Sequence, residues 1–299
     1  MPSDFILLAY GRNFPYLYEV QLPLSLFTIG AYLEEHGFTV EYYDERVEPR
    51  SRFDTLLARG PLAVGLSVMG GFQIESSLAL TRRARKLSPR SRVVWGGAFP
   101  SVMPETVLDE SGADFLVLGE GEETMLELAG ALASGTADFS SIRGLGWRDA
   151  GHSVINGRRP PPDLERLPFP FHGKVLPLLR RHLKERAGKP VGYETSRGCP
   201  FSCGFCYSQA LHGRVMAKSP AKVRRELAAL RGLGVSNLEI YDDILMGGDQ
   251  AKVLVLAEQL GAGPFSWDAN LRVDMLSGGL LRRLEASGCN ALYFGLYSP

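Results

Sequence analysis

Three of the four cysteines in the chain lie close together in the sequence. They are Cys199, Cys203 and Cys206, with the spacing C-x3-C-x2-C. Three thiolates on one short loop can bind three irons of a cubane iron–sulfur cluster; because such clusters normally take four Cys ligands, one iron then stays open to another ligand. Structural zinc is the alternative, but it takes four ligands and His212 is the one nearby candidate for a fourth. A secreted disulfide framework does not fit this clustering of so few cysteines.

The segment that carries these cysteines alternates strand-like and helix-like patterns. The cysteines directly follow the first predicted strand, and the active sites of βα barrels lie at the carboxyl ends of their strands. We therefore expect residues 191–299 to form part of a βα barrel, which stops after its fourth strand and so looks truncated. The predicted elements are strands 191–196, 236–242, 265–271 and 291–296 and helices 220–231, 250–260 and 279–287.

Residues 1–140 show the same alternation, with strands apolar enough to be covered on both faces. This predicts an α/β fold with a Rossmann-like, flavodoxin-like sheet, whose ligands bind outside the carboxyl ends of the strands. Residues 141–190 are predicted to hold a hairpin (144–156), a proline-rich linker (158–170) and a solvated charge run (180–186). The predicted elements of the first domain are strands 4–10, 39–44, 62–69, 92–98 and 114–118 and helices 24–36, 73–87, 104–111 and 122–133, with a short helix near 52–59.

Composition excludes several classes of protein. The 299 residues carry 33 Lys plus Arg and 33 Asp plus Glu, so there is no general basic field for nucleic acid or anionic lipid. The hydrophobic share of 45% and the charged share of 22% are those of an ordinary soluble globular protein. We find neither a run of about 18 apolar residues nor a signal peptide. These observations predict a cytoplasmic protein that binds neither nucleic acid nor membrane.

The segment SRGCPFSCGFCYS at 196–208 resembles the signature of the radical S-adenosylmethionine enzymes. The resemblance implies a [4Fe–4S] cluster on the three cysteines, S-adenosylmethionine chelated to the open iron, and reductive cleavage of that molecule to a 5′-deoxyadenosyl radical. It also implies that Phe205 lies near the adenine. The electron would come from a donor such as a flavodoxin or a ferredoxin.

Other residues match that family less closely. Asp242 and Asp243 end the second predicted barrel strand, where many members carry Gly-Gly-Glu against the methionine amino group; a plain acidic loop is the equal alternative. Asn270 and Arg272 share one face of the third strand, and a buried arginine there would need an anion such as the carboxylate of S-adenosylmethionine. Ser298 follows the fourth strand in Gly-Leu-Tyr-Ser, where relatives often have Gly-Leu-Glu-Ser. Cys289 is expected to be a buried structural thiol.

The strand-end loops of the first domain resemble those of the cobalamin-binding subfamily. Glycines there allow close approach of a large flat ligand, and adjoining helix starts offer free amides. The D-x-H-x-x-G motif of cobalamin mutases is absent, so no histidine of that motif is expected to ligate cobalt. We expect residues 67–73 beneath the corrin, with Met69 as a cover for its lower face. The candidate cobalamin residues are Leu22, Ser67, Met69, Gly96, Gly97, Ser101, Gly119, Glu120 and Gly121.

Together, these resemblances imply a cobalamin-dependent radical S-adenosylmethionine methyltransferase. In such enzymes one S-adenosylmethionine methylates cobalamin, and a second supplies the radical that activates an unactivated carbon of a small molecule or natural-product intermediate. A cyclase or other radical rearrangement enzyme with the same cofactors is the first alternative. A non-catalytic fragment that binds a cofactor without turnover is the second.

Overall fold

The computed structural model describes residues 5–12, 21–263 and 265–295. The chain divides into two compact units, Met1–Pro162 and Asp163–Pro299, and each is described by itself. In the described part of the chain, no helix has both the length and the apolar character needed to cross a membrane.

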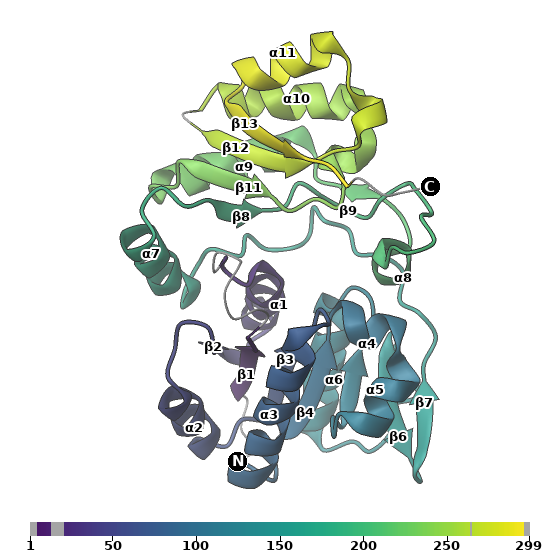
Figure 1. Ribbon diagram of the computed structural model, residues 1–299. Helices are drawn as coiled ribbons and strands as arrows, with labels where there is room; N and C mark the ends of the chain where they lie inside the picture. Colours follow the sequence, from purple (N-terminus) through teal and green to yellow (C-terminus); the bar gives the residue numbers. More distant parts are fainter. Residues whose placement is uncertain (1–4, 13–20, 264, 296–299) are drawn as a thin grey trace. The chain divides into compact units, whose positions relative to one another are not determined.

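The first unit is built on a seven-stranded sheet in the order β2-β1-β3-β4-β5-β6-β7 (Figure 1). Strands β1 to β5 are parallel, whereas β6 and β7 are antiparallel to their neighbours. The order 2-1-3-4-5 of the parallel strands is that of flavodoxin-like folds, so the predicted fold class is confirmed. The strands are β1 (Phe5–Tyr10), β2 (Thr39–Asp44), β3 (Ala63–Ser67), β4 (Arg92–Gly96), β5 (Phe115–Val117), β6 (Leu145–Asp149) and β7 (His152–Ile155).

Helices cover both faces of this sheet because its strands are apolar on both sides. Phe5, Leu7 and Ala9 of β1 pack into a core with α2, α3 and α5, while α1 contacts α6. The chain order reverses between β1 and β3, and ligands of such sheets bind outside the strand ends at that switch point. The helices are α1 (Leu24–Glu35), α2 (Arg50–Ala58), α3 (Phe72–Leu87), α4 (Ala98–Val102), α5 (Pro104–Glu110) and α6 (Glu122–Ser134).

The second unit contains a four-stranded parallel sheet in the order β13-β12-β11-β8, the arrangement expected of part of a βα barrel. Figure 1 shows α10 and α11 over one face of this sheet. Its elements are α7 (Val175–Glu185), β8 (Val191–Tyr193), α9 (Pro220–Gly232), β11 (Asn237–Ile240), α10 (Gln250–Gly261), β12 (Ser266–Asn270), α11 (Gly278–Ala286) and β13 (Cys289–Tyr293), with 3-10 turns at Leu245–Gly248 and Val273–Met275.

The first barrel strand is shorter than the sequence predicts. After β8 the chain forms β9 (Ser196–Arg197), which pairs antiparallel with β10 (Met216–Ala217). The cause is Asp242, whose Oδ1 accepts the amides of Thr195 (2.7 Å) and Ser196 (2.9 Å). Those amides are therefore not available to a longer ladder with β11, and the chain turns into the cysteine loop.

Candidate functional site

The cysteine loop runs from β9 to the short helix α8 (Ser208–His212). All three of its thiols are free, and Cys206 is exposed. The Cys206 amide donates to the Cys203 carbonyl at 3.0 Å, and the Ser208 amide lies 3.5 Å from the Cys206 sulfur. Amides directed at sulfur are typical of thiolate sites because they stabilise the charged form.

The thiols of Cys203 and Cys206 lie close enough to Cys199 to affect its pKa. Burial raises the pKa of the Cys199 thiol, and the nearby Asp243, Cys206 and Cys203 raise it further. Among the described residues, no group of three His, Cys, Asp or Glu side chains stands at metal-binding spacing. The Nε2 of His212, the candidate fourth zinc ligand, lies 3.2 Å from Oδ2 of Asp243. A set of three thiols fits an iron–sulfur cluster with one open iron.

Asp242, a predicted cofactor contact, is instead an internal anchor. Its side chain is fully enclosed, and both oxygens accept hydrogen bonds from within the chain. Besides the two amides above, Oδ2 accepts from the hydroxyls of Thr195 (2.5 Å) and Ser196 (2.6 Å) and from the Met246 amide (2.9 Å). These five donors all come from within the chain, which favours the alternative of an acidic loop over a contact between Asp242 and S-adenosylmethionine.

Asp243 lies outside the cysteine loop in the sequence but contacts both of its ends. Its Oδ2 accepts the Gly198 amide at 2.9 Å, immediately before the first cysteine. Gly198 has φ +85°, and a Cβ at this position would overlap the Arg214 carbonyl, so only glycine fits the turn. Asp243 therefore joins the start of the loop to His212 at its end.

Arg272 does not have the buried surroundings that were expected of it. Arg272 lies beyond the end of β12, its side chain is 42% exposed, and its partner is Asp274, with Nη2 and Oδ2 2.6 Å apart. The strand ends at Asn270, so Arg272 is not on a buried barrel face and already has a carboxylate. Its guanidinium carbon lies 4.0 Å from the centre of the Phe201 ring in the cysteine loop.

The other predicted residues of the second unit have varied surroundings. Asn270 is exposed, and its Nδ2 lies 3.4 Å from the Asp242 carbonyl. Phe205 is 65% exposed. Ser298 lies outside the described residues. Cys289 begins β13 and is half-buried, and burial raises the pKa of its thiol to about 11.

In the first unit, the loops after β1 and β3 meet at the switch point. Ser67 is buried, with its hydroxyl 3.4 Å from that of Ser25 in α1, whereas Met69 is 44% exposed. Gln73 joins the two loops: its Oε1 accepts the Met69 amide at 2.8 Å, and its Nε2 donates to the Gly11 carbonyl at 3.3 Å. Gln73 lies in the predicted segment 67–73, but no pattern in the sequence indicates that it bridges the two loops.

The glycine loops after β4 and β5 are held against the same edge. Gly97 has φ +99°, and a Cβ there would lie 2.9 Å from the Val68 carbonyl oxygen. Ser101 donates to the Gly97 carbonyl (2.7 Å) and accepts the Gly119 amide (2.9 Å). These contacts connect the loops after β3, β4 and β5 into one continuous strand-end surface.

Further predicted residues complete this edge. Leu22 lies two residues before the start of α1, and its carbonyl accepts the Leu24 amide at 2.8 Å. Gly96 ends β4, and Glu120 lies in the loop before α6. Gly121 caps α6, and a Cβ there would lie 3.0 Å from Ile29. Large apolar side chains are exposed just after β3 and β4, which suits a flat, largely apolar ligand. They are Met69, Phe72, Val102 and Met103.

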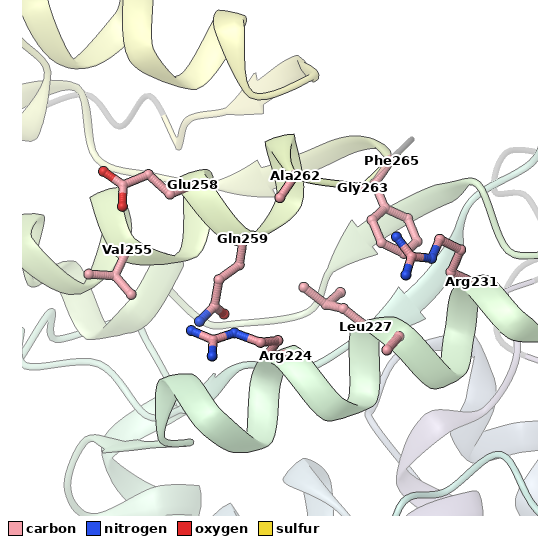
Figure 2. A pocket seen from close by; sticks show the side chains of 10 residues that line it. Arg224, Leu227, Arg231, Val255, Glu258, Gln259, Ala262, Gly263 and Phe265 are labelled. Atoms are coloured by element: carbon pink, nitrogen blue, oxygen red, sulfur yellow. The ribbon is translucent and has the colours of Figure 1, made fainter.

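A separate cavity of about 400 Å³ lies between α9 and α10. Figure 2 shows Arg224 and Gln259 projecting toward one another from these two helices. None of the residues that line it belongs to the cysteine loop or to the loops after the barrel strands. It is therefore not part of the candidate site.

Known proteins resemble this chain in its first unit and over most of its length. Residues 17–129 match the family model of the B12 binding domain. An uncharacterized methyltransferase of Pyrococcus horikoshii is 30% identical over 223 residues, which are 72% of this chain and 47% of that protein. The cytidylyl-2-hydroxyethylphosphonate methyltransferase of Streptomyces wedmorensis is 26% identical, over 92% of this chain and 61% of its own length.

A third relative carries a different activity in its name. The anaerobic magnesium-protoporphyrin IX monomethyl ester cyclase of a Synechocystis strain is 28% identical over 79% of this chain and 47% of its own length. The chain thus spans about half to three fifths of the length of these curated relatives.

A solved structure shares the fold over nearly the whole chain. It is that of TsrM, a radical S-adenosylmethionine methyltransferase from Kitasatospora setae with cobalamin and a [4Fe–4S] cluster bound. The TM-score is 0.82 at 21% identity, over 98% of this chain and 61% of that one. At this identity the likeness concerns the fold.

Proposed function

We propose that this chain, which belongs to the family of cobalamin-binding radical S-adenosylmethionine enzymes, acts as a methyltransferase on an unactivated carbon of a small molecule or natural-product intermediate. One observation carries the proposal: the chain combines a loop of three free thiols with a flavodoxin-order sheet that matches the B12 binding domain. We propose a domain boundary near Pro162, where the two compact units meet in the sequence.

Cys199, Cys203 and Cys206 would hold a [4Fe–4S] cluster, and Asp242 and Asp243 would fix the base of their loop. When bound, the cluster supplies the electron that cleaves S-adenosylmethionine, which the protein receives from an external donor such as a flavodoxin or ferredoxin. The exposed ring of Phe205 directly precedes the last cysteine and would provide a stacking surface for the adenine.

The strand-end surface of the first unit would hold cobalamin. When bound, cobalamin supplies the methyl group that is transferred. The Gly97 and Gly119 loops would allow its tail to approach the backbone, and the exposed Met69 would cover the lower face of the corrin. The Met69 amide donates a hydrogen bond to the side chain of Gln73, which fixes the backbone at Met69. The loop therefore does not need to reorganise when the ligand binds.

A cyclase is the second candidate function. The specific observation that favours it is the relative from Synechocystis, which is named for ring formation and matches 79% of this chain. Both functions use the same two cofactor sites. Methyl transfer is preferred because two of the three relatives described above are named methyltransferases.

The test is anaerobic reconstitution of the protein with iron, sulfide and hydroxocobalamin, followed by dithionite and S-adenosylmethionine. We expect about four irons and one cobalt per chain, with formation of 5′-deoxyadenosine and S-adenosylhomocysteine. Cys203→Ala should lose the iron and the deoxyadenosine but keep the cobalt. Cys289→Ala is the matched control, because Cys289 lies outside the cysteine loop and should be dispensable for iron binding.

The outcomes separate the candidates. Iron that persists in Cys203→Ala would contradict the cluster assignment, and a protein without cobalt would contradict the cobalamin assignment. With the true substrate present, deoxyadenosine without S-adenosylhomocysteine would favour the cyclase over the methyltransferase.

A further inference from the structure

The side chain of Gln209 forms hydrogen bonds with the backbone of the cysteine loop. It lies in α8, three residues after the last cysteine, and its side chain is half-buried. Its Nε2 donates to the Cys199 carbonyl at 2.7 Å and to the Phe201 carbonyl at 3.2 Å. One amide group therefore joins the helix that ends the loop to the backbone of the first cysteine and to the segment between the first two.

The same segment is held from other elements. Asp243, after β11, accepts the Gly198 amide at 2.9 Å, and Arg272, after β12, lies over the Phe201 ring at 4.0 Å. Arg272 is itself oriented by two contacts with Asp274, at 3.0 and 2.6 Å. Gln209 is the member of this set that bonds directly to the backbone of a cysteine.

We propose that Gln209 is a positioning residue for the iron–sulfur cluster, which fixes the backbone of Cys199 and Phe201 so that the three thiols close on one cluster. The inference rests on the proposed function and concerns how the cluster is retained. It assigns Gln209 no contact with iron, S-adenosylmethionine or substrate.

The physical basis is preorganisation. A loop with a cysteine at each end of an eight-residue span must lose backbone freedom when it binds a cluster, and each ordered residue costs about 1–2 kcal/mol. Two hydrogen bonds from a half-buried amide remove part of that freedom beforehand, so less binding free energy is spent on ordering. Without the donor, two loop carbonyls lose their partner and the first cysteine is released from the other two.

The experiment compares Gln209→Met, which keeps the length of the side chain but removes the donor, with Gln209→Lys, which keeps a donor. Gln259→Met is the matched control, because Gln259 donates to a backbone carbonyl, that of Pro220 at 2.9 Å, away from the cysteine loop. Each reconstituted protein is treated with an iron chelator under anaerobic conditions, and iron release is followed by absorbance. The electron paramagnetic resonance spectrum of the dithionite-reduced protein is recorded with and without S-adenosylmethionine.

We expect Gln209→Met to release iron on the order of tenfold faster than wild type, as the loss of one or two hydrogen bonds implies, and to give a broadened or heterogeneous spectrum. Gln209→Lys should largely restore both properties, and Gln259→Met should match wild type. Iron release is compared below the thermal unfolding temperatures of both iron-free proteins, so that a small loss of overall stability from the missing hydrogen bonds does not account for it.

Equal release rates and spectra for Gln209→Met and wild type would overturn the inference. So would a Gln209→Lys protein as impaired as Gln209→Met, because the donor would then not be what matters. If Gln209→Met does not fold, the comparison of Gln209→Lys with wild type still decides the question. Failure of wild type itself to take up iron would contradict the proposed function instead.

Discussion

At the scale of single residues, Asp242 and Asp243 show why a matching position does not imply a matching contact. The sequence places an acidic pair at the end of a barrel strand, and the structure finds it there. The donors that reach Asp242, however, come from Thr195 and Ser196, more than forty residues earlier in the chain. Periodicity identifies the strand end, but it does not reveal which backbone amides converge on a carboxylate.

The exposure of Arg272 does not follow from alternation. Alternation along a strand places it on the same face as Asn270 only if the strand continues that far, and β12 ends at Asn270. Outside the strand, Arg272 is exposed and forms an ion pair with the nearby Asp274. The three cysteines, in contrast, were identifiable because their chemistry depends on residue type and spacing along one short loop.

The enclosed carboxylate of Asp242 leads to a prediction about stability. Asp242→Asn replaces one acceptor oxygen by a donor that faces amide and hydroxyl donors, so at least one of the five hydrogen bonds is lost in a buried setting. We expect the free energy of unfolding to fall by about 2–4 kcal/mol, measured by urea denaturation of the iron-free protein. Asp249→Asn, at the exposed start of α10, should have a much smaller effect. An equal loss in both variants would contradict the anchoring role of Asp242.

At the scale of elements, most helices and strands could be predicted because each carries its own apolar pattern. The predicted helix 250–260 is observed as Gln250–Gly261, and the predicted hairpin is observed as β6 and β7. The first barrel strand was predicted too long, since its last amides bind Asp242 rather than a neighbouring strand. Local pattern determines an element's type, whereas long-range hydrogen bonds determine where it ends.

The close contact between Gly97, after β4, and the backbone of Val68, after β3, gives a second prediction. Gly97→Ala introduces a Cβ at φ +99° and 2.9 Å from the Val68 carbonyl oxygen. We expect a loss of about 1–3 kcal/mol in unfolding free energy and weaker binding of hydroxocobalamin, measured by absorbance titration. Gly130→Ala is the control: among the described residues nothing lies within 4 Å of its Cβ position in the middle of α6. It should stabilise the protein by about 0.5–1 kcal/mol and leave cobalamin binding unchanged.

At the scale of the whole molecule, the hairpin belongs to the first unit. Strand β6 pairs with β5, and Phe139 contacts both Phe115 (ring centres 4.8 Å apart) and Trp147 (5.5 Å). The sequence suggested a first domain of residues 1–140, because the parallel strand–helix alternation stops there. That pattern does not indicate that the following antiparallel strands extend the same sheet, since pairing between β5 and β6 depends on contacts that are distant along the chain.

This arrangement makes the boundary testable. A polypeptide of residues 1–162 contains every strand of the seven-stranded sheet, so we expect it to fold cooperatively and to bind hydroxocobalamin as the full chain does. A polypeptide of residues 1–140 lacks β6 and β7, which exposes the edge of β5 and the rings of Phe115 and Phe139. Unpaired apolar edges favour aggregation, so it should be less stable and less soluble. Circular dichroism melts and absorbance titrations compare the two; equal stability and binding would place the boundary at residue 140.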